Sequence, residues 1–280
     1  MPPIQKQSSD VDIFYETVLQ LVQSAGKLIN ERISQAKTVE VKSCEIDLVT
    51  ETDQQVEKLL IKGLSTAFPD HKFIGEESVA DGAQCALTDA PTWVIDPVDG
   101  TMNFVHSFPH SCISIALLIN QVPEIGIIYN PMLDQLFTAK RGSGAYLNGR
   151  KISVSDKSSL SEALVMMEFG TSRDPEKMKV VLENQQSLMP SVHGLRALGS
   201  AALDMAMVAC GAADAYFEYG IHIWDIAAGE CIVREAGGVV LDPAGGEIDR
   251  LSRRVLVAST SQLAEQLSNR LAQFYPLPRD

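Results

Sequence analysis

The sequence predicts a mixed α/β fold built in layers, because two kinds of pattern divide the chain between them. Apolar residues recur at helical spacing near both ends, whereas residues 112–139 form short apolar or alternating runs separated by turn residues. Helical and extended patterns then alternate through the second half. The 280 residues can bury a large core, and no Ser/Gly-rich linker divides them. We expect a flexible N-terminus over residues 1–9 and a single domain over residues 10–280.

In the first half, a helix is predicted from Asp10, with Val18, Val22 and Ile29 among the apolar residues on its buried face. A second helix is predicted from an N-cap at Thr52 to the residue before Pro69. A short apolar piece and an apolar strand follow, and the next three predicted strands cover residues 112–119, 122–129 and 136–139.

In the second half, strands and helices alternate. Strands are predicted over residues 164–168, 213–218, 239–242 and 255–258. Helices are predicted over residues 175–186, 200–210, 225–235 and 261–274. This alternation is the pattern from which a layered α/β architecture is expected.

The overall charge narrows the class of partner. The formal net charge is −13 and the isoelectric point is about 4.8, which argues against nucleic acid or an anionic membrane as the main partner. The five cysteines are scattered and form no CxxC pair, which is typical of reduced thiols. We see no secretory signal and no apolar run of membrane-spanning length, so the cytoplasm is the expected location.

The most informative segment is residues 93–104, in which an apolar strand leads into two carboxylates. Asp96 lies where the strand is expected to end, because Pro97 cannot donate to a β-ladder. Asp99 follows on a turn that Gly100 accommodates. Thr101 is predicted to N-cap a short helix whose free N–H groups attract an anion. Oxygen ligands at this spacing suit Mg²⁺ beside a phosphate.

Each acidic residue also has a purely structural interpretation. Asp-Pro and Asp-Gly are common turn dipeptides, and the surface pair Glu76-Glu77 is weak evidence by itself. Asp53 and Asp225 lie at predicted helix starts, where a carboxylate caps the helix. A capping role does not exclude a catalytic one, because Asp53 can still accept the hydroxyl proton of a threonine that orients water.

Three motifs in order resemble the signatures of the inositol monophosphatase family, in its animal-type form. Residues 96–104 (DPVDGTMNF) resemble the first signature, and residues 224–229 (WDIAAG), continued by EAGG at 235–238, resemble the second. Residues 75–78 (GEES) match a third, shorter motif. The resemblance runs from about Asp12 to the last helix.

The resemblance implies a layered α-β-α-β-α sandwich of the inositol monophosphatase and fructose bisphosphatase type, assembled as a homodimer. It also implies Mg²⁺-dependent hydrolysis of myo-inositol 1-phosphate, with two to three Mg²⁺ ions per subunit and inhibition by lithium. Such an activity supports inositol biosynthesis and phosphatidylinositol signalling.

The resemblance also implies a role for each site residue. The first Mg²⁺ would be held by Glu76, Asp96 and the Val98 carbonyl. The second would be held by Asp96, Asp99 and Asp225. A weaker third ion would be reached by Glu76 through water. Thr101 and Asp53 would orient the attacking water, and the amides of Gly100 and Thr101 would hold the phosphate. The sugar side would be formed by these residues: Asp99, Gly199, Ser200, Ala201, Glu218 and Asp225. Thr171 would lie near the sugar, and Lys42 near the metals.

Two alternatives remain open at this stage. The chain could be another phosphatase of the same superfamily, acting on a bisphosphate nucleotide, a sugar bisphosphate or histidinol phosphate. Glu218 argues against bisphosphates, because a carboxylate accepts hydrogen bonds from hydroxyls but repels a second phosphate. A non-catalytic metal-binding scaffold on the same fold is the second alternative. No GxSxG elbow or reactive-cysteine context suggests a covalent mechanism.

Overall fold

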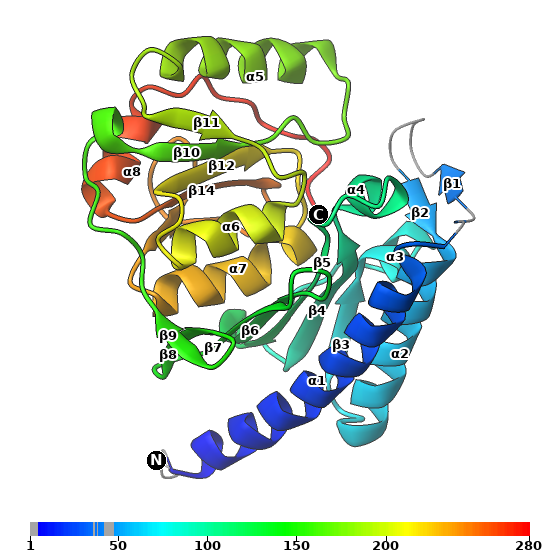
Figure 1. The fold of residues 1–280 in the computed structure, drawn as a ribbon. Helices are drawn as coiled ribbons and strands as arrows, with labels where there is room; N and C mark the ends of the chain where they lie inside the picture. Colours follow the sequence, from blue (N-terminus) through cyan, green and yellow to red (C-terminus); the bar gives the residue numbers. More distant parts are fainter. Residues whose placement is uncertain (1–4, 36, 38, 42–47) are drawn as a thin grey trace.

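The computed structural model describes residues 5–35, 37, 39–41 and 48–280, and its largest element is a seven-stranded sheet (Figure 1). The strand order is β3-β4-β5-β6-β7-β8-β9, in which β3 and β4 are parallel and all other pairs are antiparallel. The strands are β3 (Lys72–Gly75), β4 (Thr92–Asp99), β5 (Cys112–Ile119), β6 (Val122–Asn130), β7 (Gln135–Lys140), β8 (Gly144–Leu147) and β9 (Arg150–Ile152).

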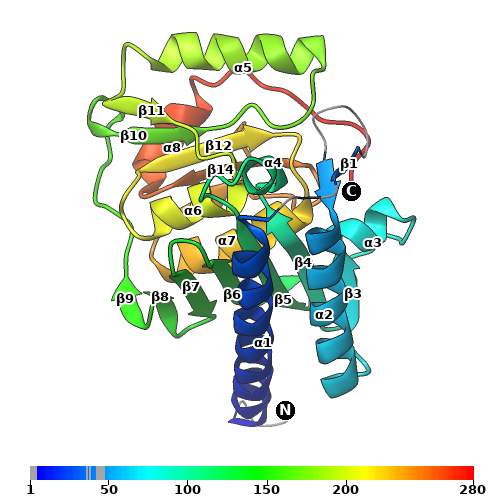
Figure 2. The same ribbon diagram turned by 45° about the vertical axis from the view of Figure 1, so that its right-hand side comes forward.

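Helices α1 (Gln5–Arg32) and α2 (Glu51–Ala67) cover one face of this sheet, as both ribbon views show (Figure 1, Figure 2). Alternation along β4 explains the layering. Trp93 and Ile95 pack with α1 and α2, whereas Val94 packs on the other face with the central helices. The eight residues of β4 are all buried because both faces of the sheet are covered.

The central layer contains α6 (Ala201–Ala209) and α7 (Ile223–Glu235), which pack between the large sheet and a five-stranded sheet. The second sheet has the order β11-β10-β12-β14-β13. Its strands are β10 (Leu164–Met167), β11 (Gly194–Arg196), β12 (Ala215–Tyr219), β13 (Val239–Leu241) and β14 (Arg254–Ala258). Its outer face is covered by α5 (Pro175–Leu188), α8 (Ser261–Ser268) and the short helix η1 (Leu160–Glu162). The predicted α-β-α-β-α layering is therefore confirmed.

The remaining elements are short. Helix α3 (Glu76–Ala80) follows β3 directly, and helix α4 (Thr101–Val105) follows β4 after Gly100. Strands β1 (Val39–Val41) and β2 (Leu48–Thr50) form a two-stranded antiparallel ribbon before α2. Lys42, which the resemblance placed near the metals, lies outside the described residues.

Several element boundaries differ from the prediction. Helix α1 begins at Gln5 rather than Asp10, and α2 is capped by Thr50 rather than Thr52. The last helix ends at Ser268 and not at residue 274, because the chain then runs as an irregular segment to the end. The N-cap of α4 is Gly100, so Thr101 is the first helical residue, and α7 begins at Ile223, two residues before Asp225.

The described residues also bear on cysteine chemistry and on membranes. Cys85, Cys112, Cys210 and Cys231 are free thiols, and burial raises the pKa of each. Among the helices that the structure describes, none has both the length and the hydropathy that a bilayer span requires.

Candidate active site

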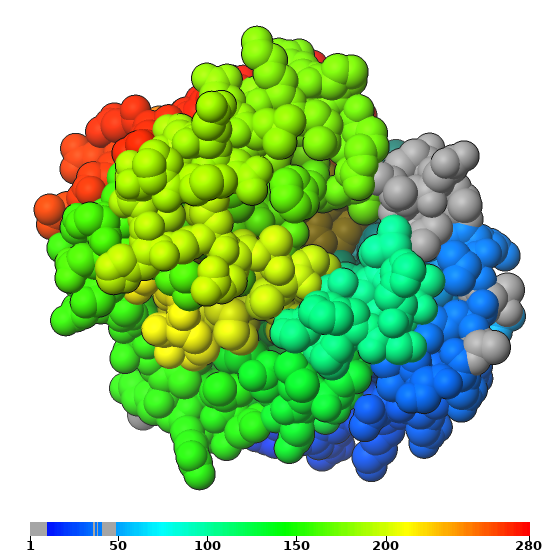
Figure 3. Space-filling view, turned by 45° about the horizontal axis from the view of Figure 1, so that its top comes forward, coloured from blue at the N-terminus to red at the C-terminus, as the bar shows by residue number. Residues whose placement is uncertain are grey.

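A large pocket of about 1170 Å³ lies where the loops of the two sheets meet. Figure 3 shows the recess between α4 and the segment that precedes α5, with atoms from the beginning of α7 at its base. Its lining includes most of the predicted site residues, namely Glu76, Asp96, Val98, Asp99, Gly100, Thr101, Gly199, Ser200, Ala201, Glu218 and Asp225. Asp53 is fully buried and lies behind this lining.

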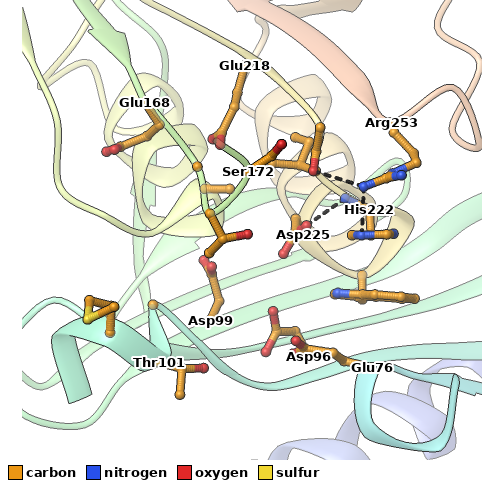
Figure 4. A pocket seen from close by; sticks show the side chains of 18 of the residues that line it. Glu76, Asp96, Asp99, Thr101, Glu168, Ser172, Glu218, His222, Asp225 and Arg253 are labelled. Carbon is orange, nitrogen blue, oxygen red and sulfur yellow. Dashed lines mark hydrogen bonds between the residues drawn. The ribbon is translucent and has the colours of Figure 1, made fainter. Parts of the chain in front are cut away.

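The pairing of β3 and β4 brings the first two carboxylates together. These strands are parallel, with Gly75 opposite Ile95, so the next residues along the chain are Glu76 and Asp96. Because parallel strands end at the same edge of a sheet, a ligand site there is expected. Figure 4 shows both carboxylates at the lower side of the pocket.

An irregularity in β4 places Asp96 and Asp99 on the same side. Asp96 is opposite Ser114 and Asp99 is opposite Cys112, so three steps along β4 match two along β5. Residues three apart in a regular strand would point to opposite faces, and one extra residue restores the same face. The prediction that β4 stops at Pro97 was wrong, because pairing resumes at Asp99. Gly100 then turns the chain with φ 83°.

Helix α7 contributes the third carboxylate. One oxygen from each of Asp96, Asp99 and Asp225 lies within 4.8 Å of the others. Backbone N–H groups orient all three: that of Val98 donates to Asp96 (3.0 Å), that of Ala202 to Asp99 (2.7 Å) and that of His222 to Asp225 (2.6 Å). Oriented carboxylate oxygens are the donor set that Mg²⁺ prefers, so these residues fit a magnesium site.

The electrostatics of this cluster favour a bound cation. Burial raises the pKa of Asp99 to about 6, and the charges of Glu76 and Glu168 add to the effect. Burial also raises the pKa of Asp225 well above its usual range, with the charge of Asp99 as the next cause. Like charges forced together in a buried site repel one another, and a divalent cation would relieve that repulsion.

Asp53 and Thr101 form a hydrogen-bonded pair beside the carboxylates. The Thr101 hydroxyl lies 3.1 Å from Asp53 Oδ1 and 3.0 Å from the Val98 carbonyl oxygen, and it can donate its single proton to either. The other oxygen of Asp53 accepts hydrogen bonds from the backbone N–H and the hydroxyl of Thr50. Asp53 is thus both the capping-box residue of α2 and a partner of Thr101.

The opposite side of the pocket is formed by the five-stranded sheet. Glu218, at the end of β12, is buried and accepts a hydrogen bond from the Tyr216 hydroxyl at 2.6 Å. Burial raises its pKa to about 8, and the charge of Glu168 adds to this. Figure 4 shows Glu218 and Glu168 above, Thr101 and Asp96 below, and Asp99 between them.

The loop before α6 joins the two sides. The Ser200 hydroxyl donates to Asp99 at 2.6 Å and accepts from the backbone N–H of Leu203, so it also caps α6. Gly199 donates its N–H to Glu168 at 2.7 Å. Ser200 was expected on the sugar side, and the structure adds a hydrogen bond to a proposed metal ligand. Thr171 lines the same pocket.

Several pocket residues were given no site role from the sequence. Glu168 was predicted only as the end of a strand, and Lys177 only as part of a helix, while Asn103 and His222 stood in or beside the quoted motifs without a role. Glu168 follows β10, and Lys177 lies in the first turn of α5. Asn103 belongs to the first signature, and its side-chain amide donates to the carbonyls of His110 and Leu198, both at 2.7 Å. His222 stacks on Trp224 with ring centroids 4.5 Å apart. The Arg253 guanidinium lies 3.1 Å from Nε2 of the His222 ring.

The layered fold and the acidic pocket define an α/β protein with a cluster of carboxylates, suited to a divalent metal, at the junction of two sheets. The family model of the inositol monophosphatase family matches residues 10–274. Inositol monophosphatase 1 of Bos taurus is 47% identical over 261 residues, which are 93% of this chain and 94% of the relative. The chain therefore belongs to the inositol monophosphatase family.

Solved structures agree with this assignment. The inositol monophosphatase from Anabaena (Nostoc) has a TM-score of 0.80 and 33% identity, covering 93% of this chain and 96% of that one. SaIMPase-II, solved with bound inositol monophosphate, has a TM-score of 0.76 and 27% identity, covering 92% and 93%.

Proposed function

We propose that this protein is a Mg²⁺-dependent phosphatase that hydrolyses myo-inositol 1-phosphate and related inositol monophosphates to myo-inositol and phosphate. The observation that carries the proposal is the convergence of Asp96, Asp99 and Asp225 within 4.8 Å, in a pocket whose far side presents the buried Glu218. The family and its 47% identical relative support the same activity. The bound ligand of SaIMPase-II supports the choice of substrate class.

The metal ligands in this proposal are those that the family resemblance implied. Glu76, Asp96 and the Val98 carbonyl would hold one ion, and Asp96, Asp99 and Asp225 a second, with Glu76 reaching a weaker third ion through water. When bound, such ions neutralise phosphate charge and acidify water. The remaining chemistry belongs to the residues of the chain itself.

Thr101 and Asp53 are proposed to position the attacking water. If the Thr101 hydroxyl donates to Asp53, the Thr101 oxygen can accept a hydrogen bond from the attacking water. That bond would orient a lone pair of the water toward phosphorus. The backbone N–H groups of Gly100 and Thr101 are proposed to bind the phosphate at the beginning of α4. These groups are preformed, so they stabilise transition-state charge without reorganisation.

The sugar side is proposed to bind inositol hydroxyls. Glu218 is a buried acceptor, and the loop of Gly199, Ser200 and Ala201 lies between it and Asp99. Asp99 and Asp225 border both sides, so each is proposed to contact substrate as well as metal. Thr171 lines the same side.

Other properties implied by the family are also proposals. We propose that the protein forms a homodimer, acts in the cytoplasm and is inhibited by lithium. Its activity would supply free inositol for inositol biosynthesis and phosphatidylinositol signalling. We further propose that residues 10–280 act as one domain, since α6 and α7 pack against both sheets.

The test is phosphate release from a panel of esters, with and without Mg²⁺, for the wild type and Glu218→Gln. The wild type should need Mg²⁺ and prefer inositol 1-phosphate. Glu218→Gln should lower kcat/KM for inositol 1-phosphate by a factor that corresponds to a loss of roughly 1–3 kcal/mol in transition-state binding, typical of a charge-assisted hydrogen bond. Its effect on 2-glycerophosphate should be smaller. Equal losses on both esters would remove Glu218 from the proposed sugar contacts.

A further inference from the structure

Lys177 is a buried cation at the edge of the pocket. It lies in the first turn of α5, is 1% exposed and lines the pocket on the side of Glu218. Lysine is seldom buried to this extent unless it is paired. Its backbone N–H is fixed by Asp174 Oδ1 at 2.9 Å, which helps to anchor this turn of α5 over the pocket.

Two glycines leave room for the Lys177 ammonium. A Cβ atom added to Gly170 would lie 2.6 Å from Lys177 Nζ and 3.1 Å from Glu218 Oε1. A Cβ atom added to Gly220 would lie 3.0 Å from the same Nζ. The ammonium therefore lies against the backbone of both glycines, and the Glu218 carboxylate borders the same space.

Within the part of the chain that the structure describes, no side-chain hydrogen bond joins the Lys177 ammonium to another protein atom. The ammonium is also not one of the fully enclosed polar atoms without a partner, so it faces the open pocket. The neighbouring guanidinium groups differ in this respect. Arg173 donates to the carbonyl of Gly170 at 3.0 Å, and Arg253 donates to the carbonyls of Pro278 and Gly220. Burial lowers the pKa of Lys177, and the charge of Glu218 opposes that change.

An ammonium has three N–H donors, and at the wall of a pocket their acceptors come from water or from a bound ligand. The pocket is the space in which such acceptors can be supplied. A hydroxyl group accepts one hydrogen bond and donates another, so neighbouring hydroxyls of a polyol match a donor and an acceptor placed together. A second phosphate would suit Lys177 but would meet the carboxylates of Glu218 and Glu168.

We propose that Lys177 is a specificity-determining residue that binds the polyol part of the substrate together with Glu218, Lys177 donating to one hydroxyl and Glu218 accepting from its neighbour. The inference rests on the proposed function, because it assigns a further contact in the same site. Lys177 has no part in the chemistry at phosphorus, which lies with the residues of β4 and α4.

The first test compares Lys177→Met with the wild type on three esters: inositol 1-phosphate, sorbitol 6-phosphate and 4-nitrophenyl phosphate. Loss of charge-assisted hydrogen bonds should lower kcat/KM roughly ten- to hundredfold on the two polyol phosphates, mainly through KM. The loss on 4-nitrophenyl phosphate, which has no alcohol hydroxyl, should be clearly smaller. Lys179→Met, an exposed lysine on the same helix, should match the wild type throughout.

The wild-type order of substrates tests the proposed function separately from Lys177. A wild type that prefers no polyol phosphate would refute inositol specificity, whereas equal losses of Lys177→Met on all three esters would overturn the inference alone. A second readout needs no turnover: the affinity for inositol 1-phosphate, measured by calorimetry without Mg²⁺. Lys177→Met should weaken this binding and Lys179→Met should not, and an unchanged affinity of Lys177→Met would overturn the proposal even in an inactive preparation.

Discussion

Asp53 shows how one side chain can belong to two hydrogen-bond systems. Its Oδ2 accepts from Thr50 and closes the capping box of α2, while its Oδ1 lies within hydrogen-bond distance of the Thr101 hydroxyl beside the carboxylate cluster. The capping interpretation and the catalytic interpretation, which the sequence could not separate, are therefore compatible. The cap fixes the carboxylate, and a fixed carboxylate can orient the Thr101 hydroxyl.

We predict that Thr101→Ala and Asp53→Asn each lower kcat with little change in KM, because both act on the attacking water. Their effects should not add in the double variant, since they form one hydrogen-bonded unit. Thr50→Ala is the matched control: it should cost about 0.5–2 kcal/mol of stability through the cap but retain more activity than Thr101→Ala. Additive losses in kcat would reduce Asp53 to a helix cap.

Asp96 occupies the central place in the carboxylate cluster, because it lies within β4 one step beyond the Gly75–Ile95 pair that precedes Glu76, and within reach of Asp99 and Asp225. We predict that Asp96→Asn lowers kcat by more than roughly 100-fold, beyond the loss typical of residues that only support a ligand. Asp81→Asn, which removes a carboxylate from the rim of the same pocket, should retain most activity. A folded Asp96→Asn enzyme with near-normal turnover would contradict the assignment.

Among the secondary-structure elements, β4 and α7 show how much sequence reasoning can achieve. The motif residues were found because carboxylates, glycine and threonine directly after an apolar strand are distinctive. The irregularity between Asp96 and Asp99 was not predicted, since a bulge depends on pairing with β5 and leaves no signature in β4 alone. Lys177 and Glu168 were missed because only the tertiary fold brings α5 and β10 to the pocket.

A second feature at the level of secondary structure is the ion pair that joins the end of β13 to β14. The guanidinium of Arg254, 2% exposed, donates to both oxygens of Asp242 and to the carbonyl of Phe274 at 2.7 Å. Burial alone would raise the pKa of Asp242, but the hydrogen bonds from Arg254 and Ala244 lower it overall. The pair therefore holds the strand edge and the C-terminal segment together.

The direction of this pKa shift predicts a pH dependence of stability. A carboxyl whose pKa is lowered by folding stabilises the protein above its unfolded pKa, and that contribution disappears as pH falls through the folded pKa. Asp242→Asn should cost about 3 kcal/mol at pH 7, because it leaves Arg254 buried without its charge partner. The difference from wild type, measured by urea unfolding, should shrink below about pH 4.

The comparison variant is Asp12→Asn, which removes the more exposed ion pair with Lys140. It should change stability by less than about 1 kcal/mol. A difference between wild type and Asp242→Asn that stays constant down to pH 2 would contradict the proposed origin of the stabilisation.

For the whole molecule, the layered architecture could be predicted from the sequence, but the contacts between the layers that form the pocket could not. The alternation of helices and strands indicated an α/β fold, and the family resemblance supplied the order of layers. The residue pattern alone did not place Asp225 near Asp99, because that proximity depends on α7 packing against β4 and β5; only the family resemblance implied it, by assigning both residues to one Mg²⁺. The Ser114 hydroxyl donates to the Trp224 carbonyl at 2.9 Å and ties the beginning of α7 to the large sheet.

We predict that a metal ion bound at the carboxylate cluster stabilises the whole molecule. Carboxylates from β4 and α7 repel one another when they are brought together, so a cation that binds only the folded protein should stabilise it. At a Mg²⁺ concentration of about 100 times Kd, the gain should be about 2.7 kcal/mol. Thermal unfolding with EDTA, with Mg²⁺ and with KCl of equal ionic strength measures this gain. Equal shifts with KCl and Mg²⁺ would indicate screening rather than a specific site.

The junction between the two sheets also bears on how such an enzyme diversifies. The groups proposed for chemistry at phosphorus come from β3, β4, α4 and the beginning of α7, whereas Glu168, Lys177 and Glu218 come from β10, α5 and β12. On the proposed roles, substitutions in the second group should change which alcohol is accepted and leave the groups that act at phosphorus in place. Mutations can therefore alter substrate selectivity and catalytic reactivity separately, so the substrate range of such an enzyme can evolve while catalysis is retained.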